Sequence, residues 1–171
     1  MTAPCKVFAV VPAAGMGKRM GAGINKQYLQ LGGMPIVART LQTLHSYPAL
    51  SGIILVIPEP EIPYCRREVV EGYDLHKVLA VVSGGAERQH SVLNGLHALR
   101  SLAADDDIVL IHDGVRPFID SAMMHRSIQL AVTGIGALTA VPTKDTMTLS
   151  ATVPIVIIVR LGKASGVGRV Q

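Results

Sequence analysis

Residues 7–20 read VFAVVPAAGMGKRM, an apolar run that passes directly into a loop of small and cationic residues. The run predicts a short buried strand, and the two glycines after it allow a sharp turn that brings backbone N–H groups close to an anion. Three cations follow in quick succession, namely Lys18, Arg19 and Lys26. A polyphosphate needs both side-chain charge and loop amides, so the segment predicts a phosphate cradle.

Two common glycine motifs do not fit this loop. A dinucleotide fingerprint, G-x-G-x-x-G, would need its third glycine where Met20 stands, and Gly21 comes one residue late. A P-loop needs Ser or Thr directly after its lysine, but Arg19 follows Lys18. The remaining alternative is an ordinary glycine turn after the first strand of an α/β protein.

The composition favours one globular domain, residues 1–171, over a membrane or nucleic-acid-binding protein. The chain is 49% hydrophobic but only 4% aromatic, which predicts an aliphatic core. No apolar run reaches the roughly 20 residues of a membrane span and no export signal is visible, so we expect a cytoplasmic protein without membrane contact. Residues 149–171 supply +3 of the net charge of +4, and the nearly neutral remainder argues against a nucleic-acid partner.

Apolar runs rich in β-branched residues alternate with segments of helical periodicity. The predicted strands cover residues 7–11, 52–57, 78–82, 108–111 and 137–141. The predicted helices begin at Pro35, cover residues 61–72 and 87–102, and follow the N-cap candidate Asp120 to about residue 132. Continuous apolar strands alternating with helices predict an α/β fold, with a mostly parallel sheet and helices on both faces.

The polar clusters of the chain all follow predicted strands. The third strand is followed by Gly84 and Gly85, with Arg88 and Ser91 on the start of a helix; the fourth is followed by Asp113 and Arg116, and the fifth by residues 142–146. Since the carboxyl ends of parallel strands share one edge of a sheet, we expect these clusters to meet the glycine loop there.

Each cluster also has a plainer interpretation. The two glycines allow a base or ribose to approach closely, or they form a turn before an ordinary helix. Asp113 is suited to hold a divalent cation or a substrate hydroxyl, with Arg116 gripping an anionic substrate; alternatively, the two form an ion pair that closes a turn.

Other titratable residues carry weaker signals. We expect His112 to be held by packing rather than to act as a base, and the remaining histidines lack ligand spacing. Cys5 and Cys65 show no metal spacing and no surroundings that would activate a thiol. Asp105, Asp106 and Asp107 precede a strand, so we interpret them as a solvated turn at the opposite edge.

Taken together, the motifs resemble one family of enzymes. P-A-A-G-x-G-x-R-M with K-Q-Y-L, G-G-x-x-R-x-x-S-V, H-D-x-x-R-P and P-x-x-D-T occur in order between about residues 7 and 147. This combination closely resembles the 2-C-methyl-D-erythritol 4-phosphate cytidylyltransferases of the non-mevalonate isoprenoid pathway. The resemblance implies a Rossmann-like nucleotidyltransferase fold, a homodimer, and Mg²⁺-dependent conversion of CTP and methylerythritol 4-phosphate to CDP-methylerythritol and pyrophosphate.

The resemblance also assigns roles to residues of this chain. The nucleotide-binding set that it implies consists of Ala13, Ala14, Gly15, Met16, Gly17, Lys18, Lys26, Gly84, Gly85, Arg88, Ser91 and Gly114. Arg19 and Lys26 would stabilise charge at the reacting phosphorus, while Asp113, Arg116 and Thr146 would contact the sugar-alcohol phosphate. The phosphates of CTP, rather than a dedicated protein site, would hold most of the Mg²⁺.

The resemblance ends after Met147. Residues 148–171 lack the T-P-Q segment and the late lysine of the family, so we expect a chain whose activity is impaired. The apolar run 153–159 would form a hazardous exposed edge unless another strand pairs with it. Alternatives to the main interpretation are a ribitol 5-phosphate cytidylyltransferase, a sugar-nucleotide pyrophosphorylase and a catalytically inactive CTP-binding or dimerisation module.

Overall fold

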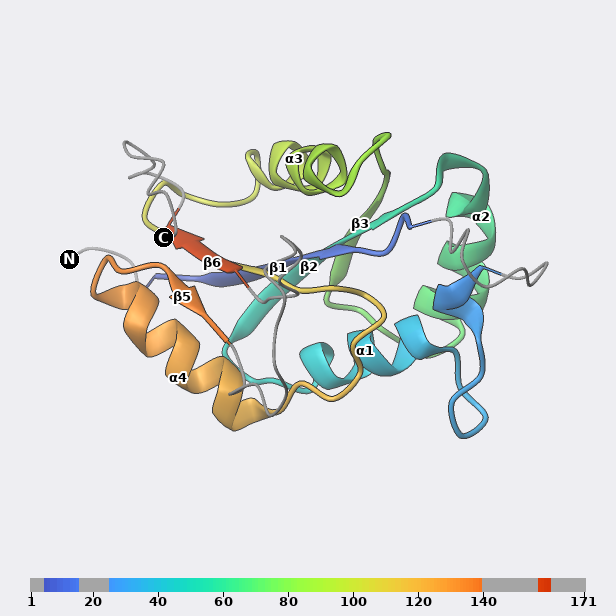
Figure 1. The fold of residues 1–171 in the computed structure, drawn as a ribbon, viewed down its shortest axis with the longest axis horizontal. Helices are drawn as coiled ribbons and strands as arrows, with labels where there is room; N and C mark the ends of the chain where they lie inside the picture. The colour runs from blue at the N-terminus through green and yellow to red at the C-terminus, as the bar shows by residue number, and fades with distance from the viewer. Residues whose placement is uncertain (1–4, 16–24, 140–156, 161–171) are drawn as a thin grey trace, which may run out of the picture.

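A six-stranded sheet organises the part of the chain that the structure, a computed structural model, describes: residues 5–15, 25–139 and 157–160 (Figure 1). The strand order is β3-β2-β1-β4-β6-β5. The strands are β1 Val7–Pro12, β2 Leu50–Ile57, β3 Val78–Ser83, β4 Ile108–Ile111, β5 Ala137–Leu138 and β6 Ile157–Arg160. The first four are parallel neighbours, which confirms the predicted mostly parallel sheet.

The last two strands complete the sheet in a way that the sequence pattern did not predict. β6 pairs antiparallel with β4 on one side and with β5 on the other. β5 therefore points the same way as β1 to β4 although it does not touch β4 in the sheet. We expected the apolar run 153–159 to leave an exposed strand edge unless another strand paired with it. The part of this run that lies in β6 is paired, because its backbone has a strand on each side. Of the predicted strand 137–141, the structure shows β5 at Ala137–Leu138, and residues 140 and 141 lie outside the described part of the chain.

Helices cover both faces of the sheet. In Figure 1, α3 (Arg88–Leu99) lies on one side, and α1 (Ile36–His45) and α4 (Ser121–Val132) lie on the other. Side chains of β1 alternate between the two faces: Phe8 and Val10 pack with Leu99 of α3, while the neighbouring positions of β1 join the core beneath α1 and α4. This alternation follows from the two-residue period of a strand, and it encloses the parallel strands on both sides.

The helix boundaries follow local signals. α1 begins directly after Pro35, and α4 begins after Asp120, whose Oδ1 accepts a hydrogen bond from the backbone N–H of Met123 at 2.7 Å. This side chain satisfies one of the N–H groups that a helix start leaves without a partner. The predicted helix 61–72 is composite: η2 (Glu59–Glu61) and α2 (Ile62–Cys65) continue into η3 (Arg66–Glu71), a turn of π-helix.

The aspartate cluster before β4 differs from the solvated turn that we predicted. Asp105 and Asp106 are exposed, but Asp107 is only 5% exposed. Its carboxylate accepts the backbone N–H of Lys6 at 2.7 Å and that of Ala104 at 2.8 Å. Lys6 directly precedes β1, so Asp107 ties the start of that strand to the turn leading into β4. The prediction was wrong for Asp107 because the group it binds lies far away in sequence.

Candidate active site

A cavity of about 660 Å³ opens at the carboxyl ends of the parallel strands, and we call it the first cavity. Five short segments form its wall: residues 12–15, 26–27, Pro58, residues 84–88 with Ser91, and Asp113 with Val115. The structure therefore brings together the clusters that follow β1, β3 and β4, as the strand pattern predicted. It also adds Pro58, Ala86 and Glu87, which the sequence did not single out.

The loop after β1 is packed tightly between its neighbours. A Cβ atom added to Gly84 would lie 2.3 Å from the Cβ of Ala14, and one added to Gly114 would lie 2.7 Å from the Cβ of Ala13. Both glycines are thus required for the close approach of three loops. The backbone N–H of Ala13 donates to the carbonyl of Val56 at 2.7 Å, so this amide belongs to the sheet and is not free for a phosphate.

Ser91 braces the loop after β3. Its hydroxyl oxygen accepts the backbone N–H of Gly85 at 3.1 Å and donates to the carbonyl of Glu87 at 3.3 Å. These bonds fix the path of the glycine pair along the wall of the first cavity. The side chain is buried and lines the cavity from the start of α3.

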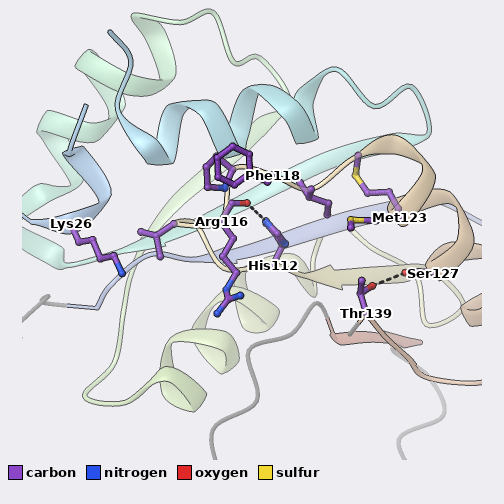
Figure 2. A pocket seen from close by; sticks show the side chains of 11 residues that line it. Lys26, His112, Arg116, Phe118, Met123, Ser127 and Thr139 are labelled. Carbon is purple, nitrogen blue, oxygen red and sulfur yellow. Dashed lines mark hydrogen bonds between the residues drawn. The ribbon is translucent and has the colours of Figure 1, made fainter. Parts of the chain in front are cut away.

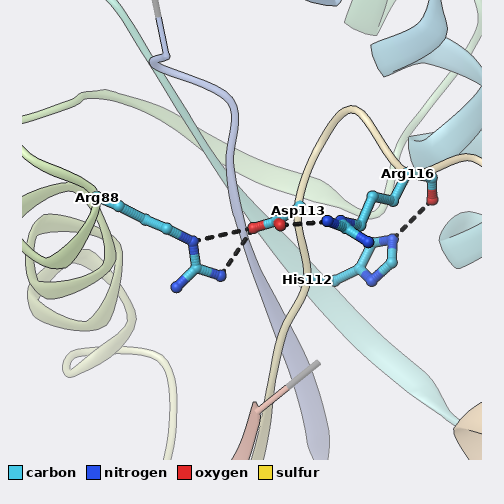
Figure 3. Close-up of polar contacts among 4 residues, drawn as sticks. All are labelled: Arg88, His112, Asp113 and Arg116. Carbon is cyan, nitrogen blue, oxygen red and sulfur yellow. Dashed lines mark hydrogen bonds and ion pairs between the residues drawn. The ribbon is translucent and has the colours of Figure 1, made fainter. Parts of the chain in front are cut away.

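The Asp113 carboxylate joins two arginines that come from different parts of the fold (Figure 3). Its Oδ1 accepts from Nε and Nη2 of Arg88 at 3.1 and 2.7 Å. Its Oδ2 accepts from Nε of Arg116 at 3.1 Å. The plainer interpretation predicted an ion pair between Asp113 and Arg116, and this pair is present. Arg88 belongs to the same group of charges.

His112 holds the turn that carries Asp113 and Arg116. Its ring is 3% exposed, and its Nε2 lies 2.9 Å from the carbonyl oxygen of Arg116. A carbonyl only accepts, so Nε2 carries the proton and Nδ1 does not. Burial lowers the pKa of His112, which keeps the ring uncharged near neutral pH. These contacts agree with our expectation that packing orients His112.

A second cavity of about 460 Å³ adjoins the first on the other side of the Asp113–Arg116 turn. Figure 2 shows Lys26 and Arg116 among the side chains around it, with the Ser127–Thr139 hydroxyl pair on its far wall. The remaining wall is mostly apolar, formed by residues 117–119 and by Met123 and Met124. Lys26 and Val115 line both cavities, so a single lysine faces both spaces.

A network that the sequence did not reveal supports Lys26. Glu61 accepts a hydrogen bond from the side-chain amide of Asn25 and another, at 2.9 Å, from Nε2 of the buried Gln27. These two amides flank Lys26 at the start of η1 (Lys26–Tyr28), so Glu61 fixes the short helix that carries the lysine. The K-Q-Y-L motif includes Gln27, but no local pattern connects it with Glu61.

Five predicted site residues lie outside the part of the chain that the structure describes. These are Met16, Gly17, Lys18, Arg19 and Thr146. The other predicted residues surround the two cavities or, as Gly114 does, pack against their walls. They are Ala13, Ala14, Gly15, Lys26, Gly84, Gly85, Arg88, Ser91, Asp113, Gly114 and Arg116.

Burial raises the pKa of the Cys65 thiol to about 12, which agrees with our view that it is not a nucleophile.

The donor chemistry of the first cavity does not form a protein cage for a metal ion. Two carboxylates line it, Glu87 and Asp113, and both oxygens of Asp113 already accept from guanidinium groups. Among the described residues, no three His, Cys, Asp or Glu side chains form a group suited to a metal ion. The site residues described here thus offer cations and amides to an anion, rather than oxygen ligands to Mg²⁺.

The sheet is mostly parallel, helices cover both of its faces, and glycine loops and cations converge at the carboxyl ends of its parallel strands. These features define a Rossmann-like nucleotidyltransferase. The model of one family, 2-C-methyl-D-erythritol 4-phosphate cytidylyltransferase, matches residues 7–159. A curated protein of that name from Geobacter metallireducens is 58% identical over 141 residues, which cover 82% of this chain and 61% of the relative. The chain belongs to this family.

Solved structures agree with this assignment. The chain resembles the crystal structure of 4-diphosphocytidyl-2C-methyl-D-erythritol synthase from Anaerococcus prevotii, with a TM-score of 0.69, 28% identity, and coverage of 85% of this chain and 59% of that one. A second synthase structure of that name has a TM-score of 0.74 and 26% identity, and covers 94% of this chain and 77% of the other. The chain spans about 60% of the length of the curated relatives it matches.

Within the described residues, every helix is too short or too polar to cross a membrane.

Proposed function

We propose that this chain transfers a cytidylyl group from CTP to 2-C-methyl-D-erythritol 4-phosphate and releases pyrophosphate. The family and the names of the relatives support the two substrates. The observation that carries the proposal is the position of Lys26, which lines two adjoining cavities. One cavity would receive CTP and the other the sugar-alcohol phosphate, so that their phosphates meet beside one cation.

The proposed reaction needs no covalent intermediate on the protein. A phosphate oxygen of methylerythritol 4-phosphate attacks the α-phosphorus of CTP and forms a new P–O bond. The bond from the α-phosphorus to the oxygen bridging to the β-phosphate breaks, and the electron pair leaves with pyrophosphate. The attacking oxygen is already anionic, so it requires no general base. The protein positions the two anions and neutralises the charge of the transition state.

The residues divide this work by position. Lys26, with Arg19, would stabilise the growing charge at the α-phosphorus. The loop after β1, with Gly84, Gly85 and Ser91, would hold the nucleotide, while Asp113 and Arg116 would meet the sugar-alcohol phosphate, together with Thr146. Glu61 would keep Lys26 in place through Asn25 and Gln27.

The proposal extends to the cation, the assembly and the compartment. We propose that Mg²⁺ enters on the triphosphate of CTP, because Asp113, one of the two carboxylates that line the first cavity, is engaged by two arginines. The family resemblance supports a homodimer, which sedimentation analysis would test. The use of CTP, a nucleotide of the cytoplasm, favours a cytoplasmic location.

Two measurements on the full chain test the proposed function. Calorimetry should detect CTP binding in the presence of Mg²⁺, and a pyrophosphate-release assay should show turnover with methylerythritol 4-phosphate. Lys26→Ala should reduce turnover by about 100-fold or more, because a cation beside the reacting phosphorus is lost. Lys6→Ala is the matched control, since this exposed lysine precedes β1 at the opposite edge of the sheet.

Each contrary outcome has its own meaning. CTP binding without pyrophosphate release would instead favour an inactive nucleotide-binding module. Faster turnover with ribitol 5-phosphate than with methylerythritol 4-phosphate would overturn the proposed substrate. Near-normal turnover of Lys26→Ala would refute the role given to this lysine.

A further inference from the structure

We propose that Arg88 is a positioning residue that acts through Asp113 and keeps Arg116 available for the sugar-alcohol phosphate. The inference rests on the proposed function and refines it. The family resemblance placed Arg88 in the nucleotide-binding set. In the structure its guanidinium engages the carboxylate that also holds Arg116.

The first argument is the way in which the Asp113 carboxylate divides its hydrogen bonds between the two arginines. Arg88 binds Oδ1 of Asp113 through two of its nitrogens, whereas Arg116 reaches Oδ2 through Nε alone. Among the described residues, neither Nη nitrogen of Arg116 makes a hydrogen bond. No described residue would thus compete with a phosphate for these two nitrogens, and Asp113 fixes the direction in which they point.

The placement of the three residues is the second argument. Arg88 and Asp113 line the first cavity, and Arg116 lines the second. Backbone bonds hold the turn between Asp113 and Arg116: the N–H of Gly114 donates to Pro12 at 3.0 Å, and the N–H of Arg116 donates to Asp113 at 3.1 Å. The side chains can therefore rearrange while the backbone stays fixed, so a change at Arg88 is transmitted through the carboxylate.

The exposure of Arg88, Asp113 and Arg116 to solvent indicates that their ion pairs contribute little to the stability of the fold. The side chains of Arg88 and Arg116 are 48% and 49% exposed, while that of Asp113 is 19% exposed. Ion pairs as accessible as these contribute only about 0.2–1 kcal/mol to folding. Variants at Arg88 should thus remain folded, and a large functional effect would not reflect unfolding.

Loss of Arg88 has a definite consequence. Without it, Asp113 would have Arg116 as its single arginine partner among the described residues and would draw it into a two-pronged pair. The carboxylate would then compete with the incoming phosphate for the same guanidinium, and its negative charge would repel that phosphate. The affinity for the sugar-alcohol phosphate should fall, while the affinity for CTP should change little.

A double-mutant cycle tests this with Arg88→Met, Asp113→Asn, the double variant and Arg67→Met. Arg67 is a matched control, because this exposed arginine forms an ion pair with Glu68 away from both cavities. We expect Arg88→Met to raise KM for methylerythritol 4-phosphate about tenfold and to leave the Kd for CTP within about twofold. The double variant should match Asp113→Asn alone, because Arg88 has no effect without the carboxylate. A weaker CTP affinity with an unchanged KM for the sugar phosphate, or effects that multiply, would overturn the proposal.

A nuclear magnetic resonance measurement tests the same contact without turnover. Hydrogen exchange at Nε–H of Arg116 should become slower in Arg88→Met, because Asp113 then binds Arg116 alone, and it should stay unchanged in Arg67→Met. Unchanged exchange in Arg88→Met would refute the positioning role even if the wild-type chain released no pyrophosphate. An inactive wild type would refute the proposed function alone, so the two failures are distinguishable.

Discussion

One aspartate lies directly before strand β4 and another lies just beyond its end, and the two behave differently. Asp107, at the amino end, is 5% exposed and binds the backbone N–H groups of Lys6 and Ala104. The carboxylate of Asp113, beyond the carboxyl end, binds the side chains of Arg88 and Arg116, and no backbone group among the described residues. The first fixes the main chain, and the second arranges groups that remain accessible to a ligand. The same kind of side chain thus fixes the backbone at one end of a parallel strand and pairs with exposed side chains at the other.

Substitution at the carboxyl end should give the largest effect on activity. Asp113→Ala frees two arginines and removes their common partner, so turnover should fall by about 100-fold. The free energy of unfolding should change by no more than about 1 kcal/mol, because the ion pairs are accessible to water. Pyrophosphate release and urea unfolding measure the two quantities. A variant with a much lower free energy of unfolding but an unchanged specific activity would contradict the role given to Asp113.

Substitution at the amino end should show the opposite pattern. Asp107→Ala removes the buried acceptor of the backbone N–H groups of Lys6 and Ala104, and the loss of these two hydrogen bonds should lower the free energy of unfolding by about 2 kcal/mol. The affinity for CTP should stay at the wild-type value under conditions where the variant is folded. Urea unfolding and calorimetry test this, and a stable variant with weak CTP binding would remove the distinction between the two aspartates.

The smallest effect concerns pH and His112, which directly precedes Asp113. Burial lowers the pKa of His112 in the folded state, so below the unfolded value of about 6.5 the unfolded chain binds the extra proton. The stability from the uncharged ring is present above that value and is lost as the pH falls. His112→Gln lacks this titration, so the stability difference between wild type and variant should shrink between about pH 7 and 5.5. Urea unfolding at several pH values measures it, and a constant difference would show that His112 does not contribute in this way.

Local signals allowed much of the fold to be predicted. The bounds of β4 match the predicted residues 108–111, and Asp120 caps α4 as expected, because strand runs and helix caps depend on neighbouring residues. The described residues of the clusters after β1, β3 and β4 also gather as predicted, since strand direction alone places them at one edge of the sheet.

The remaining features depend on residues far apart in the sequence. Asp107 binds a backbone group 101 positions away, Glu61 meets Gln27 across 34 positions, and Arg88 meets Asp113 across 25. No periodicity or short motif encodes such contacts. The insertion of β6 between β4 and β5 is likewise determined by tertiary pairing, because an apolar run shows that it needs partners but not which ones.

The insertion of β6 also affects the order in which the chain can fold. In the described sheet, β5 pairs with β6 alone, so it has no place in the sheet until Ile157–Arg160 has been synthesised. The edge of β4 therefore stays open during synthesis after the first four strands have formed. An open apolar edge is the part of a growing chain most prone to pair with other molecules. A short segment near the end of the sequence thus protects the strand beside which the site is built.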